Sequence, residues 1–151
     1  VEGLAARLER EPEDLEGWRM LAQSYLVLDR PDEAYGALGQ GLEHFPNDPG
    51  LLLALARIEI VLAQEEGAEP DMSLGDAIPL VPPEAARFYE RLLAVIPEHE
   101  EALWMVGLAE AQSGNRDKAR ELWLRLLALT PQESESRAAL ERYLEALEKQ
   151  P

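Results

Sequence analysis

Four prolines recur along the chain at a nearly fixed interval, and this period constrains the fold more than any other feature of the sequence. Pro12, Pro46, Pro97 and Pro131 are separated by 34, 51 and 34 residues. The middle interval exceeds the other two by 17 residues, so we interpret it as one period plus an insertion. Self-similarity at such a period is the signature of stacked structural repeats.

The residues between these prolines also match in register. Large and small side chains alternate at the same positions of each unit: Trp18, Leu21, Ala22, Tyr25, Ala34 and Leu38 in the first; Leu52, Leu55, Ala56, Glu59, Ala85 and Tyr89 in the second; Leu103, Val106, Gly107, Glu110, Ala119 and Trp123 in the third. Small residues let two helix axes approach closely, and large ones fill the space between helices. Each proline ends a helix, because the residue before a proline is disfavoured in the α conformation. The pattern predicts two antiparallel helices per unit.

A 34-residue period with this pattern resembles the tetratricopeptide repeat (TPR), W-x2-L-G-x2-Y, then A-x3-F, then P. We therefore predict an all-α fold, a right-handed TPR superhelix (an α-α solenoid) of three repeats with N- and C-terminal capping helices. A single TPR domain is expected over 1–151, with repeats at about 15–48, 49–99 and 100–133. Helices are expected at about 2–10, 14–28, 31–44, 49–65, 83–95, 99–113 and 116–129, followed by a charged capping helix at 133–148.

The insertion at 66–82 contains Gly67, Pro70, Gly75, Pro79 and Pro82, so it cannot be one regular helix. We favour a tolerated surface loop. The alternative is a flap beside a binding groove. Its apolar residues predict that part of it packs against the domain; they are Met72, Leu74, Ile78, Leu80 and Val81.

The chemistry of the sequence argues against catalysis. The net charge of −16 disfavours DNA, RNA and anionic lipid, and it would attract a basic partner. Cysteine is absent, which excludes thiolate catalysis and Cys-ligated zinc. His44 and His99 lack the i, i+4 partner of a helical metal site. Clustered carboxylates near His99 are the only hint of a hydrolytic or metal enzyme. We predict no catalytic residue, no metal site and no cofactor.

A peptide-binding groove is predicted on the first helices of the repeats, which line the concave wall of a TPR solenoid. The predicted residues are Arg19, Gln23 and Leu26 in the first unit, Leu53, Arg57 and Ile60 in the second, and Trp104 and Leu108, followed by Ala111, in the third. An aromatic anchor beside arginines is typical of binding hot spots, and an apolar stripe suits an amphipathic helix. The two arginines suit a partner's carboxylate. In the alternative reading, the N-terminal segment or the insertion covers the stripe and makes it core.

Three segments resemble the C-terminal TPR domain of bacterial cytochrome c maturation proteins that form part of a haem lyase complex. They are Pro12 to Trp18 with Leu21, Ala22 and Tyr25; Glu101 to Ala109; and Gly114 to Ala119 with Trp123, Leu126 and Leu127. The Arg and Asn cluster of carboxylate-clamp TPRs is not matched, since Ala54, Glu101 and Met105 stand at its positions.

This resemblance implies a periplasmic domain, anchored to the inner membrane by a segment outside the present sequence, which begins at Val1. It implies a chaperone that captures the C-terminal helix of apocytochrome c, contacts other subunits of the haem lyase complex and binds no haem. The alternative is a generic TPR scaffold in another multiprotein assembly.

Overall fold

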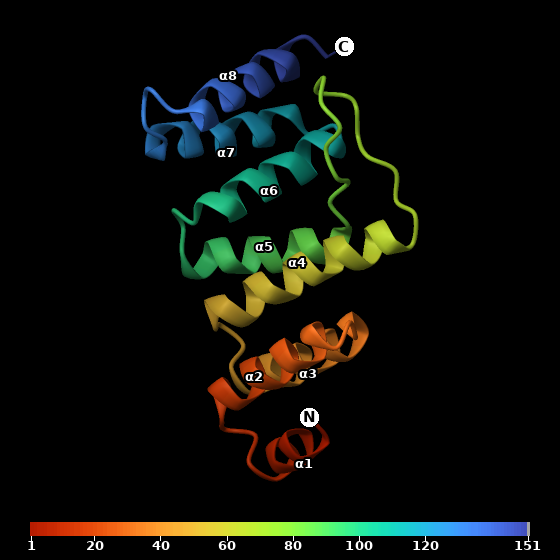
Figure 1. Cartoon of the computed structure of the whole chain (residues 1–151). Coiled ribbons are helices and arrows are strands. Elements are labelled where there is room, and N and C mark those ends of the chain that lie inside the picture. Colours follow the sequence, from red (N-terminus) through yellow and green to blue (C-terminus); the bar gives the residue numbers. More distant parts are fainter. Residues whose placement is uncertain (151) are drawn as a thin grey trace.

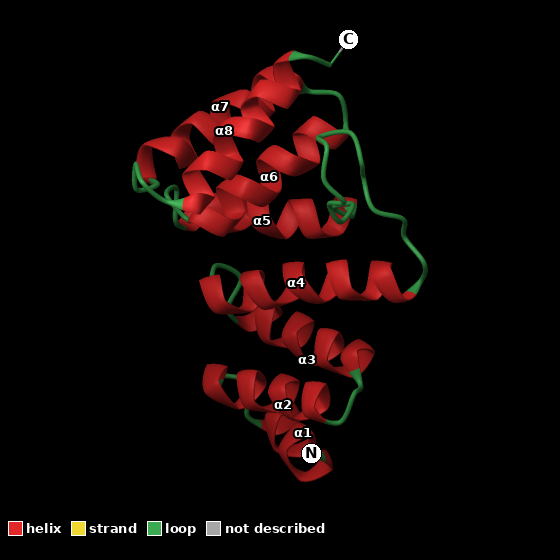
Figure 2. Cartoon of the chain, turned by 45° about the horizontal axis from the view of Figure 1, so that its top comes forward, coloured by secondary structure: helices red, strands yellow, loops and turns green. Residues whose placement is uncertain are grey.

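The computed structural model describes residues 1–150, which form eight α-helices joined by loops (Figures 1 and 2). The helices are α1 (Glu2–Arg10), α2 (Leu15–Val27), α3 (Pro31–His44), α4 (Pro49–Glu65), α5 (Pro83–Val95), α6 (Glu100–Gln112), α7 (Arg116–Leu129) and α8 (Glu135–Glu148). Within these residues the only strand-like pairing is an isolated antiparallel bridge between Asp71 and Ile78. The all-α prediction is therefore confirmed.

The helices begin where the sequence supplies caps. The carboxylate of Asp14 accepts a hydrogen bond from the Gly17 N–H at 2.8 Å, and that of Asp48 accepts one from the Leu51 N–H at 2.9 Å. Ser134 caps α8 in the same way, so this helix starts at Glu135, two residues later than expected. Such caps satisfy N–H groups that have no partner within the helix.

The helices form a stack with the termini at opposite ends (Figure 1). Helices α2 and α3, α4 and α5, and α6 and α7 pack as pairs, with α1 packed on α2 and α8 packed on α7. Successive pairs contact each other through α3 with α4 and α5 with α6. The arrangement gives one apolar core that continues from Leu8 in α1 to Leu147 in α8.

Two glycines let bulky side chains fit between paired helices. A Cβ atom on Gly107 would lie 2.5 Å from Cδ1 of Trp123, and one on Gly41 would lie 3.0 Å from Cβ of Trp18. Both tryptophans are almost fully buried, and burying a large apolar side chain contributes about 1.5–3 kcal/mol. The small residues of the repeat pattern are therefore needed for packing.

The insertion leaves the end of α4, extends to α8 beside the C-terminus and returns to α5 (Figure 1). Leu74 and Ile78 are each only 6% exposed and join the core. The side chain of Gln112, at the end of α6, makes two hydrogen bonds to the insertion. Its oxygen accepts one from the Val81 N–H at 2.9 Å, and its nitrogen donates one to the Pro79 carbonyl at 3.1 Å. The expectation that part of the insertion packs against the domain is confirmed at Leu74 and Ile78, while most of the segment is exposed loop. Whether it is a tolerated surface loop or a flap beside a groove stays a prediction.

Candidate functional site

The structure places the predicted groove residues on the first helix of each pair: Arg19, Gln23 and Leu26 on α2, Leu53, Arg57 and Ile60 on α4, and Trp104 and Leu108 on α6. They differ in exposure. Gln23, Leu26 and Arg57 are exposed, whereas Leu53 and Trp104 are half-buried, as are Arg19 and Ile60. Seven of these residues are therefore accessible in whole or in part, and their role in binding stays a prediction.

Leu108 does not fit the predicted site. Its side chain is 1% exposed, and Ala111, one turn further on, is 9% exposed. Leu108 lies one turn before Gln112, which is hydrogen-bonded to the insertion, and shares the buried cluster with Leu74 and Ile78. Leu108 and Ala111 are therefore part of the core, and Leu108 is removed from the candidate site. The insertion is bonded to Gln112 at the end of this helix, and whether it covers the rest of the stripe stays a prediction.

The two groove arginines already hold carboxylates of their own chain. Arg19 lies 2.8 Å from Asp48, the residue that caps α4. Arg57 forms two hydrogen bonds to Glu101 at the start of α6, one of them from Nε at 3.0 Å. Each pair links the first helix of one unit to the next unit. Each guanidinium group therefore has a carboxylate partner within the chain, and the expectation that it binds a partner's carboxylate stays a prediction.

The Arg57–Glu101 pair is extended by Tyr89, whose hydroxyl donates to Oε1 of Glu101 at 3.0 Å. Hydrogen bonds from Arg57 and Tyr89 hold the pKa of Glu101 below its usual value, although burial opposes the shift. Burial and the neighbouring Glu101 charge raise the pKa of Tyr89, whose ring is 1% exposed. This network holds α4, α5 and α6 together and has no acid or base poised near neutral pH.

Three aromatic rings meet between α6, α7 and α8. Trp104 stacks on Trp123 with ring centroids 5.1 Å apart and planes inclined by 17°. Tyr143 lies 5.2 Å from Trp104, and its hydroxyl donates to Asp76 of the insertion at 2.7 Å. The Trp123 indole N–H donates to the Trp104 carbonyl at 3.2 Å. Trp104 is thus held in one orientation, with part of its ring exposed.

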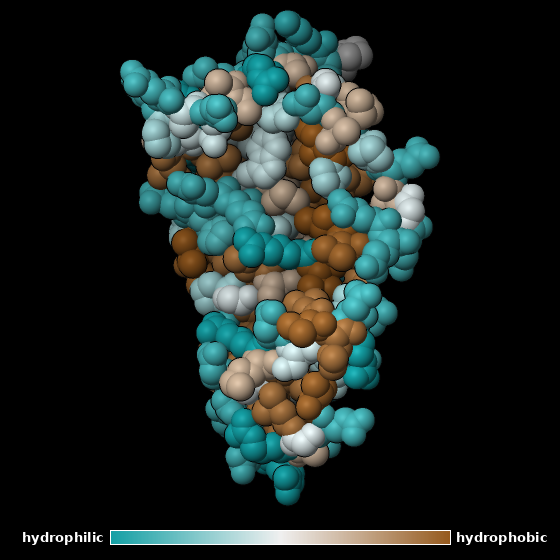
Figure 3. All heavy atoms as spheres, viewed as in Figure 1, coloured by the Kyte–Doolittle hydropathy of each residue, from teal (hydrophilic) through white to brown (hydrophobic). Residues whose placement is uncertain are grey.

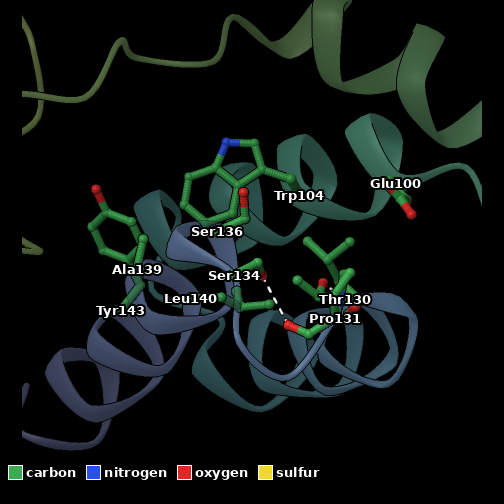
Figure 4. Close-up of a pocket in the computed structure, with 10 residues that line it drawn as sticks. Glu100, Trp104, Thr130, Pro131, Ser134, Ser136, Ala139, Leu140 and Tyr143 are labelled. Atoms are coloured by element: carbon green, nitrogen blue, oxygen red, sulfur yellow. Dashed lines mark hydrogen bonds between the residues drawn. The ribbon is translucent and has the colours of Figure 1, made fainter.

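Beside this exposed part lies a pocket of about 480 Å³ between α6, the end of α7 and the first half of α8. Figure 4 shows Trp104 and Tyr143 on one side of it, Ala139 and Leu140 of α8 below, and Thr130 and Pro131 at the far end. Most of the lining is carbon, and Glu100 is its one charged residue. The sequence reasoning missed the contribution of α8, because its many charges indicated only a polar cap.

Exposed aliphatic side chains extend along the other two units. Val27 is 76% exposed at the end of α2, and Val61 is 45% exposed at the equivalent position of α4, 34 residues later. Leu26 and Leu28 are also exposed, at 40% and 52%. Figure 3 shows hydrophobic side chains in a broken band that runs up one face of the stack, across several helices. The 34-residue spacing of Val27 and Val61 is the signal that could have added them to the predicted groove.

No group of three or more His, Asp and Glu side chains within residues 1–150 is placed to hold a metal ion. His99 caps α6 by accepting the Ala102 N–H, and His44 lies 3.8 Å from Glu13. None of the helices in this range is both long and apolar enough to span a membrane.

Paired helices in register, a 34-residue period and an apolar face on the first helices define a tetratricopeptide-repeat domain, a class of protein-binding modules. The Tetratricopeptide repeat family model matches residues 15–58. Two structures titled "Crystal structure of MamA" and "Crystal structure of MamA protein" share the fold. Their TM-scores are 0.61 and 0.63, at 15% and 14% identity, and the matches cover 97% of this chain and 83% and 78% of those chains.

In sequence, the chain is similar to two proteins named "Cytochrome c-type biogenesis protein CycH". The protein from Rhizobium meliloti (strain 1021) is 52% identical over 60 residues, which are 38% of this chain and 16% of that protein. The protein from Bradyrhizobium diazoefficiens is 30% identical over 129 residues, which are 82% of this chain and 30% of that protein. The chain therefore matches less than a third of the length of either relative.

Proposed function

We propose that this TPR domain captures a helical segment, the C-terminal helix of apocytochrome c, and acts as a chaperone in cytochrome c maturation. One observation carries the proposal: exposed aliphatic side chains stand at the same position of successive units, Val27 and Val61, and Trp104 is half-exposed on the third. Exposed apolar side chains gathered on one solvent-facing side mark an interaction site, and such a band suits the apolar face of an amphipathic helix. The name of the CycH relatives supports the pathway.

The charge of the chain supports a basic partner. With 30 acidic and 14 basic residues, the domain has an electrostatic field that accelerates association with a positively charged helix at low salt. Since Arg19 and Arg57 are paired within the chain, recognition rests on the apolar surface and on free carboxylates.

The proposal includes a location. We infer a periplasmic domain attached to the inner membrane by a segment outside this sequence, where it also contacts other haem lyase subunits. The test is a fusion of alkaline phosphatase to the C-terminus of the complete protein, as encoded in its source genome. The phosphatase is active only when it is exported, so an active fusion is expected. An inactive fusion with an intact, membrane-inserted protein would contradict the periplasmic assignment.

The binding test is a titration of the domain with a synthetic C-terminal helix of apocytochrome c, followed by Trp104 fluorescence and calorimetry. We expect saturable binding with Kd below about 100 μM, the weak end of specific recognition. A scrambled peptide of the same composition controls for charge alone. If the two peptides bind equally, or if neither binds, the proposed capture is wrong.

Matched variants locate the surface. Val61→Asp places a charge in the proposed groove, and Leu124→Asp places one on α7, where Leu124 is 49% exposed and Val61 is 45% exposed. We expect the first variant to lower affinity at least tenfold and the second to leave it within twofold. The reverse order would place the partner on the second helices, as in a scaffold that serves another assembly.

A further inference from the structure

We propose that the pocket between α6 and α8 receives one bulky apolar side chain of the partner, from a position next to a lysine or arginine. This inference rests on the proposed function and specifies its partner: an amphipathic helix in which a large aliphatic or aromatic residue adjoins basic residues.

The pocket has the size and lining of a side-chain receptor. Its volume of about 480 Å³ lies within the roughly 300–1,000 Å³ range of ligand pockets. Trp104 and Tyr143 form one wall, and Leu126 and Leu140 contribute aliphatic surface. The volume accommodates an aromatic ring together with part of the residue that follows it.

Contacts within the chain hold the two aromatic side chains of the wall in place. Trp104 is stacked on Trp123, which is fully buried, and Tyr143 is tied to Asp76 of the insertion. A wall already held in place loses little conformational freedom on binding, so more of the contact energy becomes affinity. Partly buried aromatic residues in such settings are the usual hot spots of protein interfaces.

The negative charge near the pocket favours a basic residue next to the partner side chain that enters it. Glu100 lines the pocket, Glu98 precedes it by two residues, and Glu133 and Glu135 flank the lining residue Ser134. None of these four carboxylates forms an ion pair with any residue from 1 to 150.

Two arginines are bonded to this part of the chain, and only one of them is paired with a carboxylate. Arg125 donates to the Pro97 carbonyl at 2.8 Å, and Arg137 donates to the carbonyls of Leu127 and Thr130 and pairs with Glu141. Arg125 keeps its positive charge, so four glutamates at or near the lining residues face one unpaired arginine and leave a net negative charge. An apolar pocket in such surroundings is complementary to an apolar side chain beside a basic one.

The probes for the test are two capped dipeptides, N-acetyl-Phe-Lys-amide and N-acetyl-Phe-Glu-amide. Their binding to the ¹⁵N-labelled domain is followed by shifts of the Trp104 indole and of the α8 amides. We expect the Phe-Lys probe to give saturable, millimolar shifts there, and to bind at least threefold more tightly than Phe-Glu. This ratio should approach one in 0.5 M NaCl, because salt screens exposed charges.

Variants that fill the pocket provide the control. Ala139→Leu and Ser136→Leu introduce larger side chains into the lining, and Ser136 is exposed, so its replacement leaves the fold intact. Ala138→Leu is the matched control, because Ala138 is exposed on the same helix and does not line the pocket. We expect both filled variants to lose at least 80% of probe binding and the control to keep it. No saturable shift up to 20 mM, or equal binding by all variants, would overturn the inference.

The same variants are then titrated with the apocytochrome c helix, which separates this inference from the proposed function. Weakening at least tenfold in the filled variants alone supports both. If the helix binds all variants equally, the pocket is not used and the inference is overturned while the proposed function stands. If the helix fails to bind the unmodified domain but the Phe-Lys probe binds in the pocket, the proposed function is wrong and the pocket serves another basic helix.

Discussion

The first and last helix pairs use tryptophan in opposite ways. Trp18 in α2 is 3% exposed, and its indole N–H donates to the Pro12 carbonyl at 2.9 Å. Trp104 in α6 stands one position beyond the equivalent residue, Leu103, which is fully buried. One residue rotates a side chain by about 100° around a helix axis. The same residue type therefore fills the core in the first pair and forms the wall of a pocket in the last.

The two ends also differ in what surrounds their tryptophans. The first pair is flanked by the short helix α1 and by α4, and its exposed large apolar residues are Met20, Leu26, Val27 and Leu28, none of them aromatic. In the last pair, Trp104 contacts Trp123 of α7 and Tyr143 of α8, the insertion is bonded to Tyr143, and a pocket lies beside Trp104. The comparison indicates that a partner would meet a broad exposed apolar surface at the N-terminal end and a single pocket at the C-terminal end.

The largest effect that would test this comparison is on stability. Trp18→Ala and Trp123→Ala each remove a buried indole, and we expect each to cost about 3–5 kcal/mol of unfolding free energy. Trp104→Ala should cost less than half as much, since its ring is only half-buried, yet it should weaken binding of the apocytochrome c helix more. Urea denaturation and calorimetric titration measure the two quantities. Equal losses of stability in Trp18→Ala and Trp104→Ala would break the distinction.

The next effect concerns helix contact in the last pair. Gly107→Ala forces a methyl group against Trp123, so we expect a loss of about 1–3 kcal/mol and a disturbed Trp104 signal. Gly36→Ala in α3 is the control, because nothing lies within 4 Å of the added carbon. Alanine is the better helix former, so the control should gain about 0.5–1 kcal/mol. A neutral Gly107→Ala would show that the last pair tolerates a wider separation of its helices.

The contribution of the insertion is tested at Tyr143. Tyr143→Phe removes its hydrogen bond to Asp76, and we expect a loss of about 0.5–1.5 kcal/mol with faster amide exchange in the insertion. Tyr25→Phe is the counterpart in the first pair, where Arg30 lies over the ring face and no insertion is present. Its stability should stay within about 0.5 kcal/mol. The same loss in both variants would mean that the insertion does not support the pocket wall.

The smallest effect is a pH dependence at the contact between the second and third units. Because Arg57 lowers the pKa of folded Glu101, this carboxylate stabilises the domain above its unfolded pKa of about 4.3. The contribution disappears as the pH falls through the lowered folded value. Solvent screening of the half-exposed pair limits it to about 0.5–1 kcal/mol.

Glu101→Gln should therefore be less stable than the unmodified domain at pH 7 and approach it below pH 4. Denaturation at a series of pH values measures this difference. Glu43→Gln, at an exposed glutamate without an ion pair within residues 1–150, should show no such convergence. If the unfolding free energies of Glu101→Gln and the unmodified domain differ by the same amount at every pH, Glu101 does not contribute to the pH dependence of stability.

Much of the fold was predictable, while the candidate site was predictable only in part. The proline period and the positions of Trp18, Gly107 and Trp123 predict helix pairs, because these choices depend on contacts within one unit. Burial of Leu108, the pairing of Arg57 with Glu101 and the pocket between Trp104 and Tyr143 join residues from different units. The local sequence has no signal for such contacts.

The sequence alone determined that the chain would form stacked helix pairs, since helix propensity, caps and apolar periodicity act over a few residues. Only the tertiary structure decided which part of the apolar face remains open. One end of α6 is bonded to the insertion through Gln112, and Trp104 near the other end lies with α8 beside a pocket. That outcome depends on how segments distant in sequence dock against a shared core.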